Sequence, residues 1–200
     1  MSTNRYIDFS GETERLSIRA WRLEDAESAF EMYGDPRVAK YLSGIPETSV
    51  ESQLETLQRI IASYSKMGIG YGSFPFIEKA TGNLIGAVLL KPLPRTDELD
   101  QWRAFRDNPD QLPPIHEIEI GWHVKYNQWG KGFATEAART MMDVGFRDFE
   151  LDEIHAVLYK ENTASRNVAE KLGMSYIGST DKFYGVEVEH FIKTKSAHLF

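Results

Sequence analysis

The stretch His116-Glu-Ile-Glu-Ile-Gly-Trp-His-Val124 alternates apolar and polar side chains and runs into the glycine-bearing turn Asn127-Gln-Trp-Gly-Lys-Gly132. Alternation with a period of two predicts a strand, in which every second residue from Ile118 to Val124 shares one face. After the turn, small and apolar residues recur at helical spacing and predict an amphipathic helix. They are Ala134, Ala137, Ala138, Met141, Met142 and Gly145. A strand, a glycine turn and a helix therefore follow one another in the middle of the chain.

Further elements are predicted on both sides of this unit. Apolar runs or alternation predict strands at 15–19, 74–78, 84–90, 154–159, 174–178 and 186–192. Helical spacing predicts helices from Leu23 to the Asp35-Pro36 pair, from Ser49 to Tyr64, and from Asn162 to Leu172. Residues 91–115 hold five of the eight prolines and are predicted as an inserted loop, in which 97–106 could form a short helix. This order predicts a mixed α/β fold in a single domain over residues 1–200.

Composition excludes several classes of protein. With 42% hydrophobic and 26% charged residues, the chain resembles an ordinary globular protein. It has no cysteine, so disulfides and thiolate nucleophiles are excluded. A net charge of −7 argues against a nucleic-acid partner, and no apolar stretch approaches the ~20 residues that cross a bilayer. The first six residues lack the apolar core of a signal peptide, so we expect a cytoplasmic protein without a membrane partner.

Gly130 and Gly132 lie where the central strand turns into its helix. The N–H groups of a helix's first turn are unpaired, and glycines keep side chains from covering them. The helix dipole adds partial positive charge there, to which Lys131 and the Thr135 hydroxyl could contribute. The pattern predicts a phosphate cradle, with a purely steric role for the glycines as the alternative. Walker and dinucleotide motifs are absent, which counts against a nucleotide-binding scaffold.

The run from Glu119 to Ala138 resembles the acetyl-CoA-binding core of the GNAT N-acetyltransferase superfamily. Gly132 and Ala134 meet the pattern Gln/Arg-x-x-Gly-x-Gly/Ala. Trp129 departs from its first position and is similar to the RimJ/RimL-like branch, whose members acetylate ribosomal-protein N-termini or small molecules. Three further stretches agree with that branch in the same order: Thr13-Glu-Arg-Leu-Ser-Ile-Arg19, Thr81-Gly-Asn-Leu-Ile-Gly86 and Asn162-Thr-Ala-Ser-Arg-Asn-Val-Ala-Glu-Lys-Leu-Gly173. The resemblance thus covers about residues 13–192, apart from 91–115, and implies that this range is the core of the domain.

The resemblance implies a fold and a coenzyme. The expected fold is a mostly antiparallel twisted sheet with helices on both faces, in which strands 118–124 and 154–159 run parallel and splay apart. Acetyl-CoA would lie in that cleft without any metal, its diphosphate on the backbone amides of residues 128–134. An N–H near residues 122–124 would face the thioester carbonyl as an oxyanion device. The implied coenzyme-binding residues are Trp122, His123, Val124, Gln128, Trp129, Gly130, Lys131, Gly132, Phe133, Ala134, Thr135, Asn162 and Ser165.

Acetyl transfer to an amine requires a base, because alkyl ammonium groups have a pKa of ~10.4. Glu119 is the candidate base, and Glu117, one pleat away on the same face, could share or replace it or bind the acceptor. Solvated carboxylates on an open strand face are the alternative interpretation. His123 on that face is a lesser candidate for the base.

The leaving thiolate requires an acid. Many relatives use a tyrosine seven residues after the asparagine, where this chain has Ala169. Ser165 matches the serine that the RimL-like branch places near the sulfur, and a bound water is the alternative acid. The alternative role of Ser165 is to cap its own helix. Tyr41 and Leu42 match positions that line the acceptor pocket in this branch.

The predicted function is direct transfer of an acetyl group from acetyl-CoA to a primary amine, on a small molecule or a protein N-terminus. An acyl-enzyme on cysteine is excluded because the chain has none. A catalytically silent acyl-CoA-binding or regulatory module is the alternative, favoured by the missing tyrosine. A homodimer is compatible with the sequence, which does not determine the quaternary structure.

Overall fold

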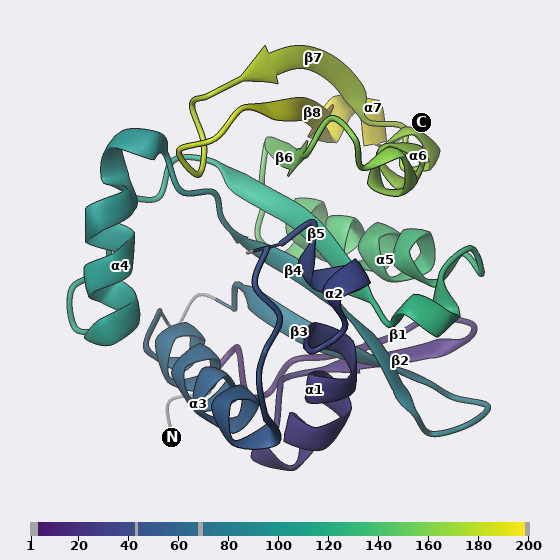
Figure 1. Ribbon diagram of the computed structural model, residues 1–200. Coiled ribbons are helices and arrows are strands. Elements are labelled where there is room, and N and C mark those ends of the chain that lie inside the picture. Colours follow the sequence, from purple (N-terminus) through teal and green to yellow (C-terminus); the bar gives the residue numbers. More distant parts are fainter. Residues whose placement is uncertain (1–3, 43, 68–69, 199–200) are drawn as a thin grey trace.

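A computed structural model describes residues 4–42, 44–67 and 70–198 (Figure 1). Within these ranges, eight strands form one sheet in the order β1-β2-β3-β4-β5-β6-β8-β7. The neighbouring strands pair antiparallel except β5 and β6, which are parallel. The predicted mixed sheet with one parallel pair is thus confirmed. The strands are β1 Ser10–Glu12, β2 Leu16–Arg19, β3 Gly72–Glu78, β4 Leu84–Pro92, β5 Ile118–Val124, β6 Glu153–Leu158, β7 Ser175–Thr180 and β8 Val188–Thr194.

Helices cover both faces of the sheet, as predicted (Figure 1). α1 to α3 pack on one face against β4, and α5 with α6 packs on the other. No helix in the described ranges is long and apolar enough to span a bilayer. The α-helices are α1 Ala26–Tyr33, α2 Pro36–Ala39, α3 Val50–Met67, α4 Leu99–Asp107, α5 Phe133–Asp148, α6 Thr163–Lys171 and α7 Lys195–His198, with 3-10 turns η1 Leu23–Asp25, η2 Thr96–Glu98 and η3 Tyr126–Gln128.

The alternation of β5 places its two sets of side chains as the sequence predicts. Ile118 and Ile120 are buried in the core that α5 covers. On the opposite face, the antiparallel register sets Glu119 beside Lys91 and His123 beside Ala87 of β4. Since Ala87 packs with α1 and α3, this second face of β5 points toward the helices of the N-terminal half. Of the polar side chains predicted to share this face, His123 contacts Tyr33 of α1. The sequence alone could not assign α1 to this face.

The helical stripe of α5 forms the centre of the larger core. Ala137, Ala138 and Met141 are each fully buried against the sheet. A Cβ at Gly145 would lie 2.8 Å from Ile154 Cδ1 of β6, so glycine lets helix and strand approach closely. This packing fixes the start of α5 relative to β5 and β6.

Three local features differ from the sequence predictions. The first helix ends before the predicted Asp35-Pro36 boundary, but Pro36 also begins α2, with Asp35 accepting from the Arg37 N–H at 2.9 Å. Proline suits this first helical position, where an N–H would have no helical partner. The segment 91–115, expected as a loop, contains η2 and α4, in line with the short helix considered at 97–106. β1 was not predicted, because three residues carry too little periodicity.

Candidate active site

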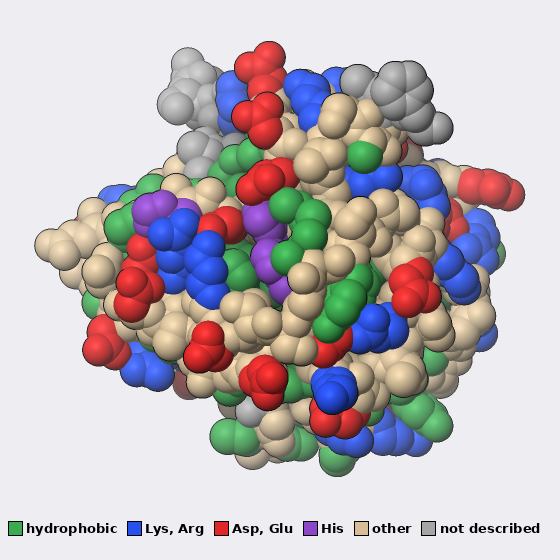
Figure 2. Space-filling model, turned by 90° about the horizontal axis from the view of Figure 1, so that it is seen from above, with side chains coloured by type: hydrophobic (Ala, Val, Ile, Leu, Met, Phe, Trp, Pro, Cys, Tyr) green, Lys and Arg blue, Asp and Glu red, His purple; other side chains and the backbone are tan. Residues whose placement is uncertain are grey.

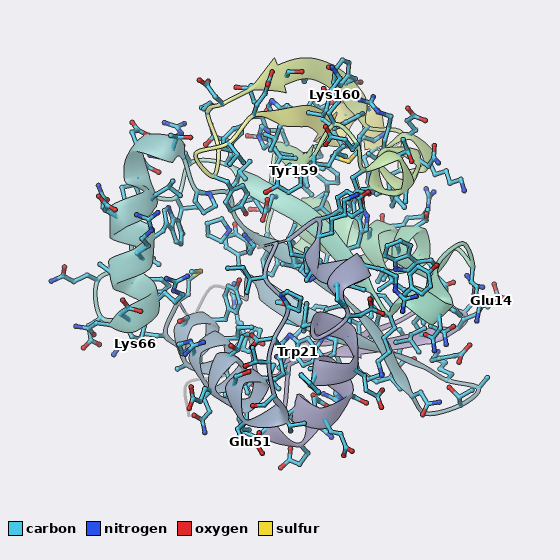
Figure 3. All side chains as sticks on the ribbon, viewed as in Figure 1. Glu14, Trp21, Glu51, Lys66, Tyr159 and Lys160 are labelled. Atoms are coloured by element: carbon cyan, nitrogen blue, oxygen red, sulfur yellow. The ribbon has the colours of Figure 1, made fainter. Side chains whose placement is uncertain are left out.

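A cavity lies where the two parallel strands diverge. β5 and β6 are paired at Glu119 and His155, and residues 120–124 and 156–159 line a cavity of about 740 Å³. Tyr159, labelled in Figure 3, follows the end of β6 and belongs to this lining. Pockets for small ligands and cofactors typically measure roughly 300–1,000 Å³. The cleft expected between these strands therefore has the size of a ligand site.

The turn after β5 presents the start of α5 to the cavity. Gly130 and Gly132 have positive φ angles of 77° and 84°, a region that glycine enters without strain. The first hydrogen bond of α5 runs from the Glu136 N–H to the Gly132 carbonyl at 3.1 Å, so the N–H groups of residues 133–135 precede the helical ladder. Gly132, Phe133, Ala134 and Thr135 line the cavity. This helix start is suited to an anion such as a phosphate group.

Arg15, which the sequence analysis did not single out, holds this turn in place. Its guanidinium donates to the Lys131 carbonyl at 3.0 Å, lies over the Phe133 ring at 4.5 Å and pairs with Glu136 at 2.6 Å. The Lys131 ammonium donates to Gln128 Oε1 at 2.7 Å, and Lys131 does not belong to the cavity lining. Arg15 lies more than a hundred residues away in sequence, and no local pattern indicates this contact.

Trp129 closes the same turn from the strand side. Its indole N–H donates to the Val124 carbonyl at 2.8 Å, and its ring meets Tyr126 edge-on with centroids 5.1 Å apart. Trp129 also lines the cavity. Trp129, which stands where the motif has Gln or Arg, therefore stabilises the turn through its side chain. Its neighbours Gln128 and Gly130 also line the cavity.

Asn162 and Ser165 line the cavity from the start of α6. Asn162 is the N-cap, and its side chain accepts from the Ser165 N–H at 3.1 Å. The Ser165 hydroxyl accepts from the Trp122 indole N–H at 3.3 Å, which leaves the hydroxyl proton to be donated elsewhere. Asn162, not Ser165, therefore caps this helix, and the serine hydroxyl lies beside β5.

The buried Glu119 forms a cluster with the partly buried side chains of Lys91 and Tyr184. Glu119 is 7% exposed, forms an ion pair with the Lys91 ammonium and accepts a hydrogen bond from the Tyr184 hydroxyl. Lys91 also donates to the Tyr184 hydroxyl oxygen at 2.6 Å. Burial and the adjacent Glu119 carboxylate raise the pKa of Tyr184, which keeps this phenol protonated. All three side chains line the cavity, and the alternative of an openly solvated Glu119 does not fit this burial.

Tyr184 is held in place by hydrogen bonds between two loops that are distant in sequence, residues 94–96 and 182–185. It has a positive φ of 58°, and its N–H donates to the Pro94 carbonyl at 3.2 Å. Thr96 accepts from the Gly185 N–H at 3.1 Å and donates its own N–H to the Lys182 carbonyl at 2.7 Å. The β7–β8 turn is therefore fixed to the start of the 91–115 segment. The sequence did not point to Lys91 or Tyr184, because Lys91 reaches Glu119 through the pairing of β4 with β5 and Tyr184 through the hydrogen bonds between the two loops.

Glu117 lies outside the cavity lining, in a cluster of its own. Arg95 donates to both of its carboxylate oxygens at 2.8 and 2.9 Å, and Lys182 donates at 2.6 Å. Burial acts to raise the pKa of Glu117, but the hydrogen bonds from Arg95 and Lys182 outweigh it and lower the pKa to about 2. The structure therefore brings Glu119 into the cavity but not Glu117.

His123 lines the cavity and contacts Tyr33 of α1. The Tyr33 hydroxyl lies 3.0 Å from His123 Nδ1. Burial, and to a lesser degree the Lys91 charge, lower the pKa of His123 to about 4. The imidazole is therefore neutral at pH 7.

The shifted pKa of His123 predicts a loss of stability in acid. The pKa of His123 is about 4 in the folded protein, below its ordinary value of 6.5. The neutral imidazole therefore contributes its full share of stability above pH 6.5, and this contribution is lost as the pH falls through 4. We expect His123→Gln to reduce the loss of unfolding free energy between pH 7 and pH 4 by about 2 kcal/mol, measured by urea unfolding. His155 and His190, whose pKa values burial also lowers, retain part of the slope. Equal losses in both proteins would contradict this prediction.

Tyr41 and Leu42 follow α2 and line the same cavity. Val38 of α2 and Leu89 of β4 lie with them in the lining. Together with Val186 and Val188, they give the cavity that includes Glu119 several apolar side chains in its lining. The two residues expected at an acceptor pocket are therefore in one cavity with the candidate base.

The fold and this cavity define an acetyltransferase of the GNAT class. The acetyltransferase (GNAT) domain family matches residues 15–175 of the chain. The uncharacterized N-acetyltransferase p20 of Bacillus licheniformis is 32% identical over 166 residues, which cover 83% of this chain and 82% of the relative. The chain belongs to the GNAT acetyltransferase family.

Solved structures show the same fold. A GNAT-family acetyltransferase from Bacillus anthracis aligns with a TM-score of 0.71 and 23% identity, covering 94% of this chain and 99% of that one. RimJ of Mycobacterium smegmatis, solved in complex with CoA-disulfide, aligns with a TM-score of 0.70 and 18% identity, covering 95% of this chain and 88% of that one. The resemblance to the RimJ/RimL-like branch is confirmed at the level of the fold.

Proposed function

We propose that the protein transfers the acetyl group of acetyl-CoA directly to a primary amine. The observation that carries the proposal is the cavity between β5 and β6, which has an anion-binding helix start and the buried carboxylate of Glu119 in its lining. An anionic coenzyme suits the helix start, and an amine suits a carboxylate. The chain is an acetyltransferase by family, and its donor and acceptor are the proposed part.

The residues around the cavity fit a CoA thioester. The glycines of the turn keep side chains away from the N–H groups of residues 133–135, which would donate to the diphosphate. The Asn162 amide nitrogen would donate to the pantetheine arm, because its oxygen already caps α6. The bound acetyl-CoA supplies an activated thioester carbonyl.

The chain's own groups then handle charge and protons. Glu119 would take the proton that the attacking amine loses as its nitrogen forms the new bond to carbon. An N–H of β5 at residues 122–124 would donate to the oxygen on which negative charge develops. As the carbon–sulfur bond breaks, the Ser165 hydroxyl, which is an acceptor toward Trp122, would give its proton to sulfur and regain one from water. Glu119 would release the proton taken from the amine to solvent, so both side chains return to their starting states. The products are the N-acetylated amine and free CoA.

The test combines coenzyme binding with thiol release. We expect CoA to bind in a 1:1 titration, and free thiol to appear with acetyl-CoA and at least one acceptor from a panel of small amines, an amino acid amide and a short peptide. Coenzyme binding without thiol release from any acceptor would support a silent module. Absence of coenzyme binding would contradict the proposal altogether.

A further inference from the structure

We propose that the acceptor is a monoamine with an apolar body, that is, a largely hydrocarbon molecule with a single basic nitrogen. In this proposal Lys91 is the residue that rejects acceptors with a second positive charge. This inference rests on the proposed function and names its substrate class. It is carried by three observations: the charges that line the cavity, the pairing of Glu119 and the apolar walls beside it.

The lining of the cavity offers a cation little compensation. Among the described residues that line it, Glu119 is the one carboxylate, against the two lysines Lys91 and Lys171. Lys91 is partly buried, with 18% of its side chain exposed, and its ammonium is paired with Glu119. A polyamine needs a carboxylate or another acceptor for each ammonium it buries, because an unpaired buried charge is costly. This cavity has one carboxylate, which is already shared.

Carboxylates behind the cavity do not supply the missing charge. Glu117 lies one pleat from Glu119, but Arg95 and Lys182 donate to its oxygens. In the ion pairs of these two glutamates, three cations, Lys91, Arg95 and Lys182, are matched with two carboxylates, so neither carboxylate is left unpaired. On the face shown in Figure 2, basic and acidic side chains are interspersed and form no continuous acidic field, although the net charge of the chain is −7. Neither the cavity nor this face would concentrate a polycation.

Apolar side chains beside Glu119 suit a hydrocarbon body. Leu89 precedes Lys91 by two residues on β4 and therefore shares its face, and a Cβ at Gly121 would lie 3.4 Å from Leu89 Cδ1. Val38 and Leu42, from α2 and the turn that follows it, line the same cavity, as does Val186 after Tyr184. One nitrogen could meet Glu119 while the rest of the acceptor contacts these side chains. A second ammonium there would lie against apolar atoms or near Lys91, and both positions disfavour it.

A matched pair of acceptors tests the inference. n-Heptylamine and hexamethylenediamine have the same number of heavy atoms and differ at one end, where a methyl group replaces an ammonium. We expect the wild-type protein to favour heptylamine in kcat/KM by at least about tenfold, measured by thiol release at saturating acetyl-CoA. In Lys91→Met the ratio of the two kcat/KM values should fall by at least about fivefold, because the cavity then lacks the positive charge that repels the second ammonium of the diamine. Because both kcat/KM values are measured on the same variant, a general loss of turnover lowers both and leaves their ratio unchanged.

Two further variants separate charge from structure. Lys91→Arg keeps the positive charge and should keep the preference, while Lys91→Gln removes the charge with a polar side chain and should reduce it. Lys66→Met is the matched control, since Lys66 forms a surface ion pair with Asp110 at the end of α3, away from the cavity (Figure 3). It should leave the ratio unchanged, and thermal unfolding of each variant establishes that it is folded.

The outcomes distinguish this inference from the proposed function. Wild-type preference for the diamine, or folded Lys91→Met and Lys91→Gln proteins with an unchanged ratio, would overturn the inference while leaving amine acetylation intact. Absence of thiol release with every acceptor of the wider panel would overturn the proposed function and this inference with it.

Discussion

Replacement of Glu119 by glutamine is expected to lower kcat/KM for the acceptor by at least about 100-fold, because a positioned general base contributes ~10²–10⁴-fold. The amide keeps the shape of the side chain but has no basic oxygen at neutral pH. CoA affinity should change less than about threefold, since the turn at the start of α5 is unaffected. Steady-state kinetics and calorimetric titration with CoA measure the two quantities.

Glu117→Gln is the informative comparison, because Glu117 is the other carboxylate that the sequence offered as a base. It is expected to lower the free energy of unfolding by about 2 kcal/mol through weakened charged hydrogen bonds with Arg95 and Lys182, and to retain most of the turnover. If Glu117→Gln abolished turnover in a folded protein and Glu119→Gln did not, the assignment of the base would be reversed.

Gly132→Ala is expected to weaken CoA binding by about 10- to 100-fold. The φ of 84° would cost an alanine about 1–2 kcal/mol, so the turn would relax and the N–H groups of residues 133–135 would lose their common direction. Each charged hydrogen bond lost to the diphosphate costs about 1.5–3 kcal/mol. The new methyl group would also lie 3.4 Å from Arg15 Nη2, which holds the same turn. Calorimetric titration with CoA measures the effect.

Gly82→Ala provides the matched control, because Gly82 has a φ of 70° in the β3–β4 turn and does not line the cavity. It should cost similar stability, by thermal unfolding, without changing CoA affinity. Equal CoA affinity in Gly132→Ala and wild-type protein would contradict the assignment of this turn to the diphosphate.

Much of the fold could be predicted because its central elements carry strong periodicity. The alternation in β5 predicted which side chains share a face, and the small-residue stripe of α5 predicted which side of that helix packs on the sheet. Pro36 was harder to interpret, since proline ends one helix and equally well begins another. The sequence did not reveal which face α1 to α3 would cover, because that depends on packing against β4.

The candidate site was predicted in its local parts and missed in its long-range parts. Gly130 and Gly132 were identifiable from their place between a predicted strand and a predicted helix, and the structure adds that both have positive φ. The partners of Glu119 were not, because Lys91 comes from the neighbouring strand and Tyr184 from a turn 65 residues further along. Trp122 and Ser165 meet in the same way across 43 residues. Such pairs arise from topology, and no motif spans them.

The hydrogen bonds that join Pro94 and Thr96 to the turn of Tyr184 have a mechanical consequence. Any widening beside Tyr184 must either break these hydrogen bonds or shift the first residues of the 91–115 segment as well. We therefore expect changes in the length or sequence of that segment to alter which acceptors enter, while the proposed coenzyme-binding side, built on α5 and α6, stays unchanged.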